Sequence, residues 1–131
     1  MSEQREWCIS RAISYLFITF AGMTDQKITR EEMNTIVQLV REWLPNEPGE
    51  VLIENIKLTH GWVMEDVSNG TFLEQFTIIA SYLESMFDAK KKKYFLNDLV
   101  RIAVADGNFS DAERGIIKDM ATSWGMENYK I

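Results

Sequence analysis

The stretch AISYLFITFAGM, residues 12–23, is the part of this sequence that says most about its fold. It contains no charged side chain, and its apolar residues fall on every face of a helix instead of forming one stripe. A helix of this kind has to be covered by other elements on all sides, and it is shorter than the roughly 20 apolar residues that cross a bilayer. The stretch therefore predicts a buried helix at the centre of a helical fold.

The segments that follow have the spacing of amphipathic helices. In residues 28–44 an apolar stripe recurs at helical spacing with charges between, and Pro45 ends the run. The other helices are expected at residues 47–67, from Thr71 onward, from Asp88 onward and from Ser110 onward, with Asp88 as the cap of its helix. No segment of useful length alternates polar and apolar residues as a half-buried strand would. The sequence therefore predicts an all-α fold of about six helices in one domain, residues 1–131.

The composition limits the class of protein. A chain of 131 residues with 46% apolar content can bury one core without disulfides or a structural metal. Cys8 is the single cysteine, and the N-terminal MSEQREWCIS lacks the apolar core of a secretory signal. Both features predict a cytoplasmic protein without stable membrane insertion. The net charge of -6 argues against a nucleic-acid partner, because binding to phosphates depends on clustered lysine and arginine.

The second half of the chain repeats features of the first. A shift of 81 positions aligns an aspartate, a serine or threonine, a glutamate and, after an apolar stripe, a tryptophan. The aligned pairs are Asp25 with Asp106, Ile28 with Phe109, Thr29 with Ser110, Glu32 with Glu113, Ile36 with Ile117, Leu39 with Met120 and Trp43 with Trp124. Each copy also follows one of the two most apolar helices. We therefore expect an internal pseudo-repeat of two helix-loop-helix hairpins that pack together.

Both copies contain a capping box at the start of their second helix. The hydroxyl at the N-cap accepts a hydrogen bond from the N3 amide, and the N3 glutamate reaches back to the N-cap amide, which stabilises the helix by about 1 kcal/mol. The candidate boxes are Thr29 with Glu32, Ser110 with Glu113, and Thr71 with Glu74. The third has Val67 where the two copies have an aspartate. Capping therefore leaves Asp25 and Asp106 to be explained.

The spacing of residues 106–113 is similar to the second half of a calcium-binding EF-hand loop. Such a loop takes ligands at positions 1, 3, 5, 7, 9 and 12. With Glu113 at position 12, positions 1 and 3 fall on Ile102 and Val104, whose side chains contain no oxygen. Both belong to the apolar helical segment of residues 94–104, which we expect to be buried. The first copy also has apolar residues at these two positions. The sequence therefore does not predict an EF-hand pair.

Two interpretations of the acidic residues stay open. Short acidic side chains are common in loops and favour helix N-termini, whereas hard cations bind several carboxylate oxygens. The predicted ligands of a divalent cation, which would be Ca²⁺, Mg²⁺, Mn²⁺ or Zn²⁺, are Asp106, Glu113, Asp25, Glu32 and Asp111. Lys27 and Arg30 lower the negative potential of the first copy. We therefore expect the second copy to bind more strongly.

The motif LVRIAVADGNFSDAE, residues 99–113, with its degenerate copy TDQKITREE at residues 24–32, resembles the TerB-like group of bacterial tellurite-resistance and stress proteins. The resemblance covers nearly the whole chain. It implies an all-helical fold with an internal repeat, and acidic metal ligands at the helix-loop junctions. Carried over to this chain, these are Asp106 and Glu113, together with Asp25 and Glu32 in the copy where Gln26-Lys27 replaces glycine and a neutral residue.

These features predict a non-enzymatic module of a bacterial stress or tellurite response system, which binds a divalent cation or a protein partner. A metal-free protein–protein interaction domain is the alternative. An enzyme that uses clustered carboxylates would need a cleft, and no feature of the sequence supplies one. The sequence also contains no P-loop, nucleophile elbow or zinc motif.

Overall fold

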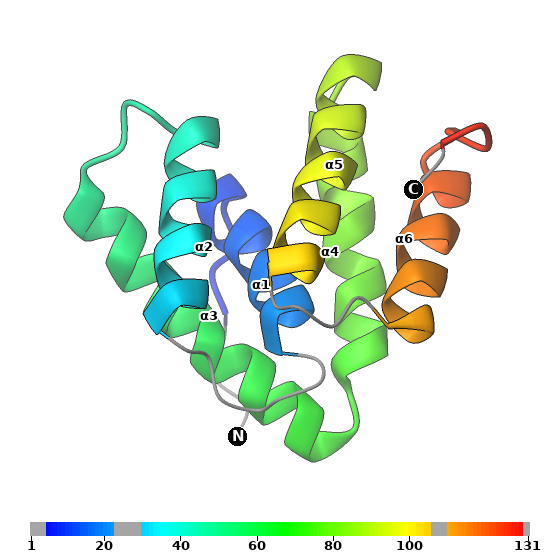
Figure 1. The fold of residues 1–131 in the computed structure, drawn as a ribbon. Coiled ribbons are helices and arrows are strands. Elements are labelled where there is room, and N and C mark those ends of the chain that lie inside the picture. Colours follow the sequence, from blue (N-terminus) through cyan, green and yellow to red (C-terminus); the bar gives the residue numbers. More distant parts are fainter. Residues whose placement is uncertain (1–4, 23–29, 106–109, 130–131) are drawn as a thin grey trace.

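The computed structural model describes residues 5–22, 30–105 and 110–129 (Figure 1). These residues form helices and connecting segments, and none of the residues in these three ranges lies in a strand. The helices are α1 (Ile9–Gly22), α2 (Arg30–Trp43), α3 (Gly49–Asn69), α4 (Phe72–Met86), α5 (Ala89–Ala105) and α6 (Asp111–Ser123). The all-α prediction with about six helices is therefore confirmed, with helix boundaries within a few residues of those expected.

Helix α1 lies at the centre, as its uncharged sequence predicts. It packs against α2, α3, α4 and α5, and Figure 1 shows it enclosed by them. Its fully buried apolar side chains are Ala12, Ile13, Tyr15, Leu16, Phe17, Ile18 and Phe20. Burying a large apolar side chain contributes about 1.5–3 kcal/mol, so this helix supplies a large part of the core.

An aromatic cluster joins the second helix of each predicted repeat copy to α5. Trp43 of α2 and Trp124 at the end of α6 both contact Phe87 and Phe95, with ring centroids 5.0–6.2 Å apart. Phe95 is fully buried and also stacks on Phe17 of α1. The two tryptophans that the 81-residue shift aligns therefore pack on the same pair of rings, although the repeat itself stays a prediction.

The start of α4 differs from the sequence prediction. Thr71 precedes Phe72 as expected, but its side chain makes no capping hydrogen bond, and the box with Glu74 is not formed. The Thr71 hydroxyl instead donates to the carboxylate of Asp66 over 3.2 Å. The backbone at Thr71, with φ -103° and ψ 5°, also lacks the extended conformation of an N-cap. Glycine is required just before it, because Gly70 ends α3 with φ +72°.

The apolar segment of α5 is buried on one face only, although its sequence suggests burial along its whole length. Its buried apolar side chains are Phe95, Leu96, Leu99, Ile102 and Ala103. Tyr94 and Val104, at the two ends of the segment, are 56% and 58% exposed. Asp88 precedes the helix and its carboxylate accepts a hydrogen bond from the Lys91 amide over 2.8 Å, so the predicted cap is confirmed.

Candidate functional site

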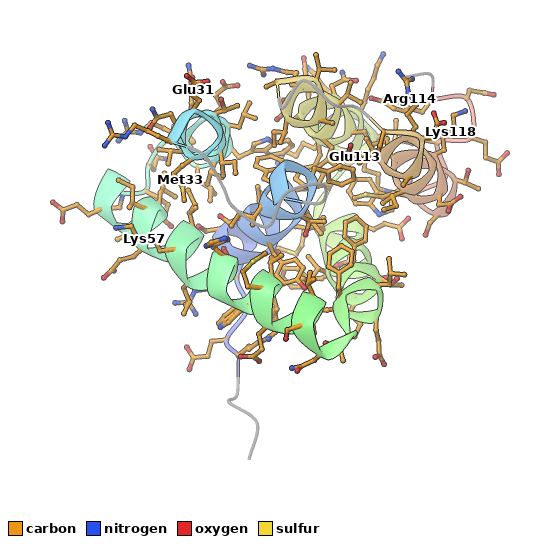
Figure 2. The ribbon with its side chains drawn as sticks, turned by 60° about the horizontal axis from the view of Figure 1, so that its bottom comes forward. Glu31, Met33, Lys57, Glu113, Arg114 and Lys118 are labelled. Atoms are coloured by element: carbon orange, nitrogen blue, oxygen red, sulfur yellow. The ribbon has the colours of Figure 1, made fainter. Side chains whose placement is uncertain are left out.

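The helix ends that adjoin the predicted acidic motifs in the sequence lie at one end of the helical bundle. Helices α1 and α5 end there, and α2 and α6 begin there (Figure 1). Figure 2 turns this end toward the viewer. Asp25, Asp106 and the Glu32 side chain lie outside the described residues. Glu113 and Asp111, both on α6, can therefore be placed directly.

Glu113 is held in a complete capping box. Ser110, in extended conformation, accepts a hydrogen bond from the Glu113 amide through its Oγ over 3.2 Å. In return, Glu113 Oε1 accepts from the Ser110 amide over 2.9 Å and from the Ser110 hydroxyl over 3.0 Å. The prediction that this pair starts the sixth helix is therefore confirmed.

Capping uses only one of the two carboxylate oxygens. Glu113 is fully buried, and its Oε2 forms no hydrogen bond within the part of the chain that the structure describes. Figure 2 shows the side chain on the face of α6 that points into the bundle, with Arg114 and Lys118 on the outer side. An ordinary N3 glutamate at a helix start is solvated, so a buried one with a spare oxygen is a costly arrangement.

Asp111 behaves differently. It is the first residue of α6 and is exposed to solvent. A carboxylate at this position interacts favourably with the helix dipole. This interaction alone explains an aspartate at the start of α6. Within the three described ranges, the acidic, histidine and cysteine side chains form no group of three or more that could hold a metal ion. A cation bound through Glu113 would therefore need backbone carbonyls or water as further ligands, or acidic side chains from outside those ranges.

Ile102 and Val104, which stand at two calcium-ligand positions of an EF-hand loop, both lie within α5. The helix continues to Ala105, so the positions where a calcium loop would begin have helical backbone. Ile102 is buried as expected, whereas Val104 is exposed. The prediction that Val104 is a core residue is wrong, but its side chain still offers no oxygen.

The family of the chain follows from comparison with known proteins. The model of the family described as tellurite resistance protein TerB matches residues 12–130. This match covers both copies of the acidic motif. The chain belongs to the TerB family. The resemblance inferred from the motif of residues 99–113 is therefore confirmed, while no curated protein and no solved structure matches the chain.

Among the described residues, no helix combines the length and the hydropathy that a membrane span requires. The central helix α1 is the most apolar of the six, and its 14 residues are covered by other helices.

Sequence reasoning missed Asp66, a buried carboxylate on α3. Asp66 is only 5% exposed and receives two hydrogen bonds from the Arg5 guanidinium, at 2.8 and 3.0 Å. The Tyr15 hydroxyl donates a third over 2.6 Å, and Thr71 donates a fourth. Burial alone raises the pKa of Asp66, but these hydrogen bonds and the charge of Arg5 outweigh it, so the pKa lies below its ordinary value.

A second buried carboxylate, Asp98 on α5, was also missed. Its Oδ2 accepts a hydrogen bond from the Trp43 indole over 2.7 Å, and its Oδ1 accepts one from Arg101 over 3.3 Å. Burial raises the pKa of Asp98, and the hydrogen bonds of Trp43 and Arg101 only partly oppose this. Asp98 thus ties α2 to α5 without a cation buried beside it, since the Arg101 side chain is 58% exposed.

The sequence contained a signal for both residues. Asp66 lies four residues after Trp62 and seven after Thr59, on the buried stripe of α3. Asp98 lies between Phe95 and Ile102 on the buried stripe of α5. A carboxylate at a core position of an amphipathic helix has to find a partner.

Proposed function

We propose that this TerB-family chain is a non-enzymatic module of a bacterial stress or tellurite response system, and that it binds a divalent cation at the end of its bundle where α6 begins. The observation that carries the proposal is the buried Oε2 of Glu113, which lacks a hydrogen bond among the described residues. The buried carboxylates Asp66 and Asp98 are engaged by their own neighbours, which favours a binding role over acid-base catalysis.

The chemistry of Glu113 suits a hard cation. Its Oε1 is fixed by the capping box, so the orientation of Oε2 is determined by the start of α6. A cation would offset the cost of burying a carboxylate oxygen without a partner. Ca²⁺ and Mg²⁺ take their ligands from carboxylates, backbone carbonyls and water. In this proposal Asp106 is the second ligand, and Asp111, Asp25 and Glu32 are the further predicted ligands.

The proposal can be tested by thermal unfolding of the full chain in chelator and in millimolar Ca²⁺, Mg²⁺, Mn²⁺ or Zn²⁺. An ion present at about 100 times its dissociation constant should add about 2.7 kcal/mol to the free energy of unfolding. Glu113→Gln is the informative variant, because glutamine can complete a capping box but removes the charge. It should lose most of the ion-dependent gain.

Glu74→Gln provides the matched control. Glu74 occupies the third position of α4, as Glu113 does in α6, but is exposed and forms no capping box. This variant should keep the full response to the ion. If no ion stabilises the wild type, or if Glu113→Gln responds as the wild type does, the metal-free interaction domain becomes the better description. An Asp106→Asn, Asp25→Asn double variant tests the remaining predicted ligands in the same way.

A further inference from the structure

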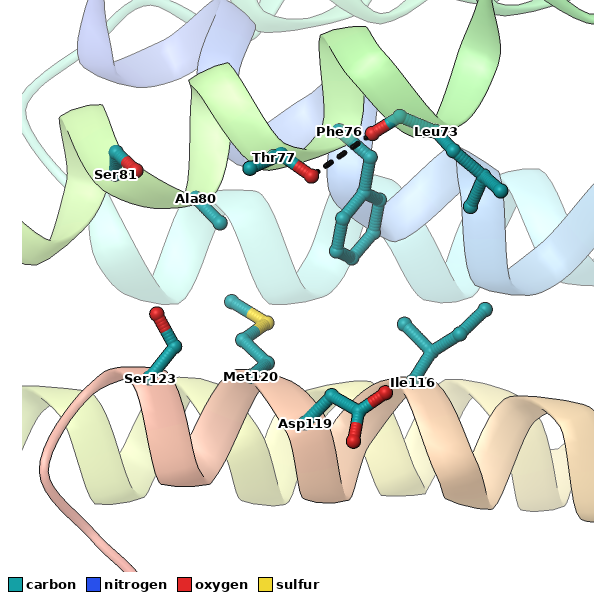
Figure 3. Close-up of a pocket in the computed structure, with 9 residues that line it drawn as sticks. All are labelled: Leu73, Phe76, Thr77, Ala80, Ser81, Ile116, Asp119, Met120 and Ser123. Carbon is teal, nitrogen blue, oxygen red and sulfur yellow. Dashed lines mark hydrogen bonds between the residues drawn. The ribbon is translucent and has the colours of Figure 1, made fainter.

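Helices α4 and α6 leave an apolar groove between them. Each packs mainly elsewhere, α4 on α1 and α3 and α6 on α5. A hydrogen bond of 3.2 Å from the Trp124 indole to the Ala80 carbonyl connects the two helices. Beside this contact lies a cavity of about 250 Å³, open to solvent (Figure 3). It is lined by Leu73, Phe76, Thr77, Ala80, Ser81, Ile116, Asp119, Met120 and Ser123.

The groove has an apolar floor and an exposed rim. Phe76 and Met120 form the floor and are 6% and 4% exposed, whereas Leu73 on the rim is 65% exposed. Figure 3 shows Phe76 of α4 and Met120 of α6 pointing into the gap between the two helices. Between Leu73 and Ser81 the groove follows α4 for about 12 Å, or roughly two helical turns. A volume of this size holds a few side chains of a partner and is smaller than most pockets for small molecules.

The polar groups of the groove define the charge of its occupant. Asp119 is the single charged residue among those that line it. It is exposed and forms no ion pair with the residues that the structure describes. The Thr77 hydroxyl is already used, because it donates to the Leu73 carbonyl over 2.9 Å. A chain with net charge -6 therefore presents an apolar groove whose one charge is negative and unpaired.

The backbone around the groove favours a helical occupant. An extended peptide binds by adding a strand to a sheet edge, and the described residues contain no strand. Proline-rich peptides bind between several aromatic rings, and the groove contains only Phe76. Two helices lying side by side with apolar residues one turn apart fit the apolar face of a third helix.

We propose that the groove between α4 and α6 binds an amphipathic helix of a partner protein, and that a lysine or arginine beside the apolar face of this helix pairs with Asp119. Leu73, Phe76 and Met120 contact the apolar face. None of the residues that line the groove is a predicted cation ligand, so this binding does not depend on the ion proposed above.

Two synthetic peptides test this inference. In both peptides a covalent bridge between two side chains stabilises the helix, and leucines one turn apart form one apolar face. The peptides differ at one position beside that face, which is lysine in the first and glutamate in the second. Binding to the full chain is measured in chelator by the chemical shifts of its amides. We expect the lysine peptide to shift the amides of α4 and α6 and to bind about fivefold to tenfold more tightly than the glutamate peptide.

Exchanging the charge of the groove provides the decisive comparison. Asp119→Lys should reverse the preference, so that the glutamate peptide binds more tightly. Glu54→Lys changes an exposed charge on α3 by the same amount and should leave the preference as in the wild type. The inference is overturned if neither peptide binds, if both bind the wild type equally, or if Asp119→Lys acts no differently from Glu54→Lys.

Discussion

Tyr15 and Asp66 form a hydrogen bond of 2.6 Å between two side chains that are almost completely buried. Tyr15 belongs to the central helix and Asp66 to the last turn of α3, so the bond joins the two helices with the most extensive contact in the fold. Arg5, from the segment before α1, pairs with the same carboxylate. This buried polar network fixes the position of the N-terminal segment as well as that of α3.

Removing the Tyr15 hydroxyl should destabilise the protein measurably. Tyr15→Phe leaves a buried carboxylate with one donor fewer, and a hydrogen bond to a charged group contributes about 1.5–3 kcal/mol. The free energy of unfolding, measured in urea, should fall by about this amount. Tyr82→Phe is the control, because the Tyr82 ring is 37% exposed, and it should stay within about 0.5 kcal/mol of wild type. Equal effects of the two variants would contradict the role given to Tyr15.

Asp66 and Asp98 should affect the pH dependence of stability in opposite directions. The folded-state pKa of Asp66 is lowered, so its contribution is complete above the unfolded value of about 3.9 and is lost as pH falls through the folded pKa. The folded-state pKa of Asp98 is raised, so its contribution is complete below about 3.9 and is lost as pH rises through the folded pKa.

Asparagine variants separate the two cases. Asp66→Asn should be strongly destabilising near pH 7 and should lessen the loss of stability in acid. Asp98→Asn should cost much less near pH 7, because the amide oxygen can still accept from Trp43 and the penalty for a buried charge is removed. Urea unfolding from about pH 3 to 7 checks both expectations. Equal costs at neutral pH would show that the two carboxylates are not distinguished in this way.

The spacing of apolar residues, together with the proline, glycine and capping residues at helix ends, was sufficient to predict the helices. The uncharged run of residues 12–23 indicates a helix that must be buried, and Pro45, Gly70 and Asp88 mark helix boundaries. The pattern could not show which way the ends of an apolar segment face. Tyr94 and Val104 belong to the apolar segment of α5, yet only the packing of neighbouring helices determines that both are exposed.

The sequence predicts the local hydrogen bonds of the candidate site better than its contacts between helices. The spacing of Ser110 and Glu113 predicts a capping box, and the structure has one. The same spacing at Thr71 and Glu74 gives none, because Asp66, close in space, takes the Thr71 hydroxyl. That Glu113 is completely buried depends on how α6 packs, which no local pattern specifies.

The two glutamates at equivalent helix positions should differ sharply when truncated. Glu113→Ala removes a fully buried side chain and leaves the Ser110 amide without its partner, so we expect a loss of about 1–3 kcal/mol. Glu74→Ala removes an exposed side chain that forms no box, and its effect should stay within about 0.5 kcal/mol. Thermal unfolding in chelator measures both without any contribution from ions. A similar loss in both variants would mean that burial of Glu113 does not determine its energetic role.

The stability of the aromatic cluster should depend strongly on Phe95 and little on the exposed Tyr94 beside it in the sequence. Phe95 is fully buried and contacts the rings of Phe17, Trp43, Phe87 and Trp124. Phe95→Ala removes the ring that these four share, and such a substitution costs about 3–5 kcal/mol. Tyr94→Ala, one residue earlier on the exposed face of α5, should cost less than about 1 kcal/mol. The urea midpoints of the two variants and their tryptophan fluorescence check the prediction, because only Phe95→Ala should change the surroundings of Trp43 and Trp124 together.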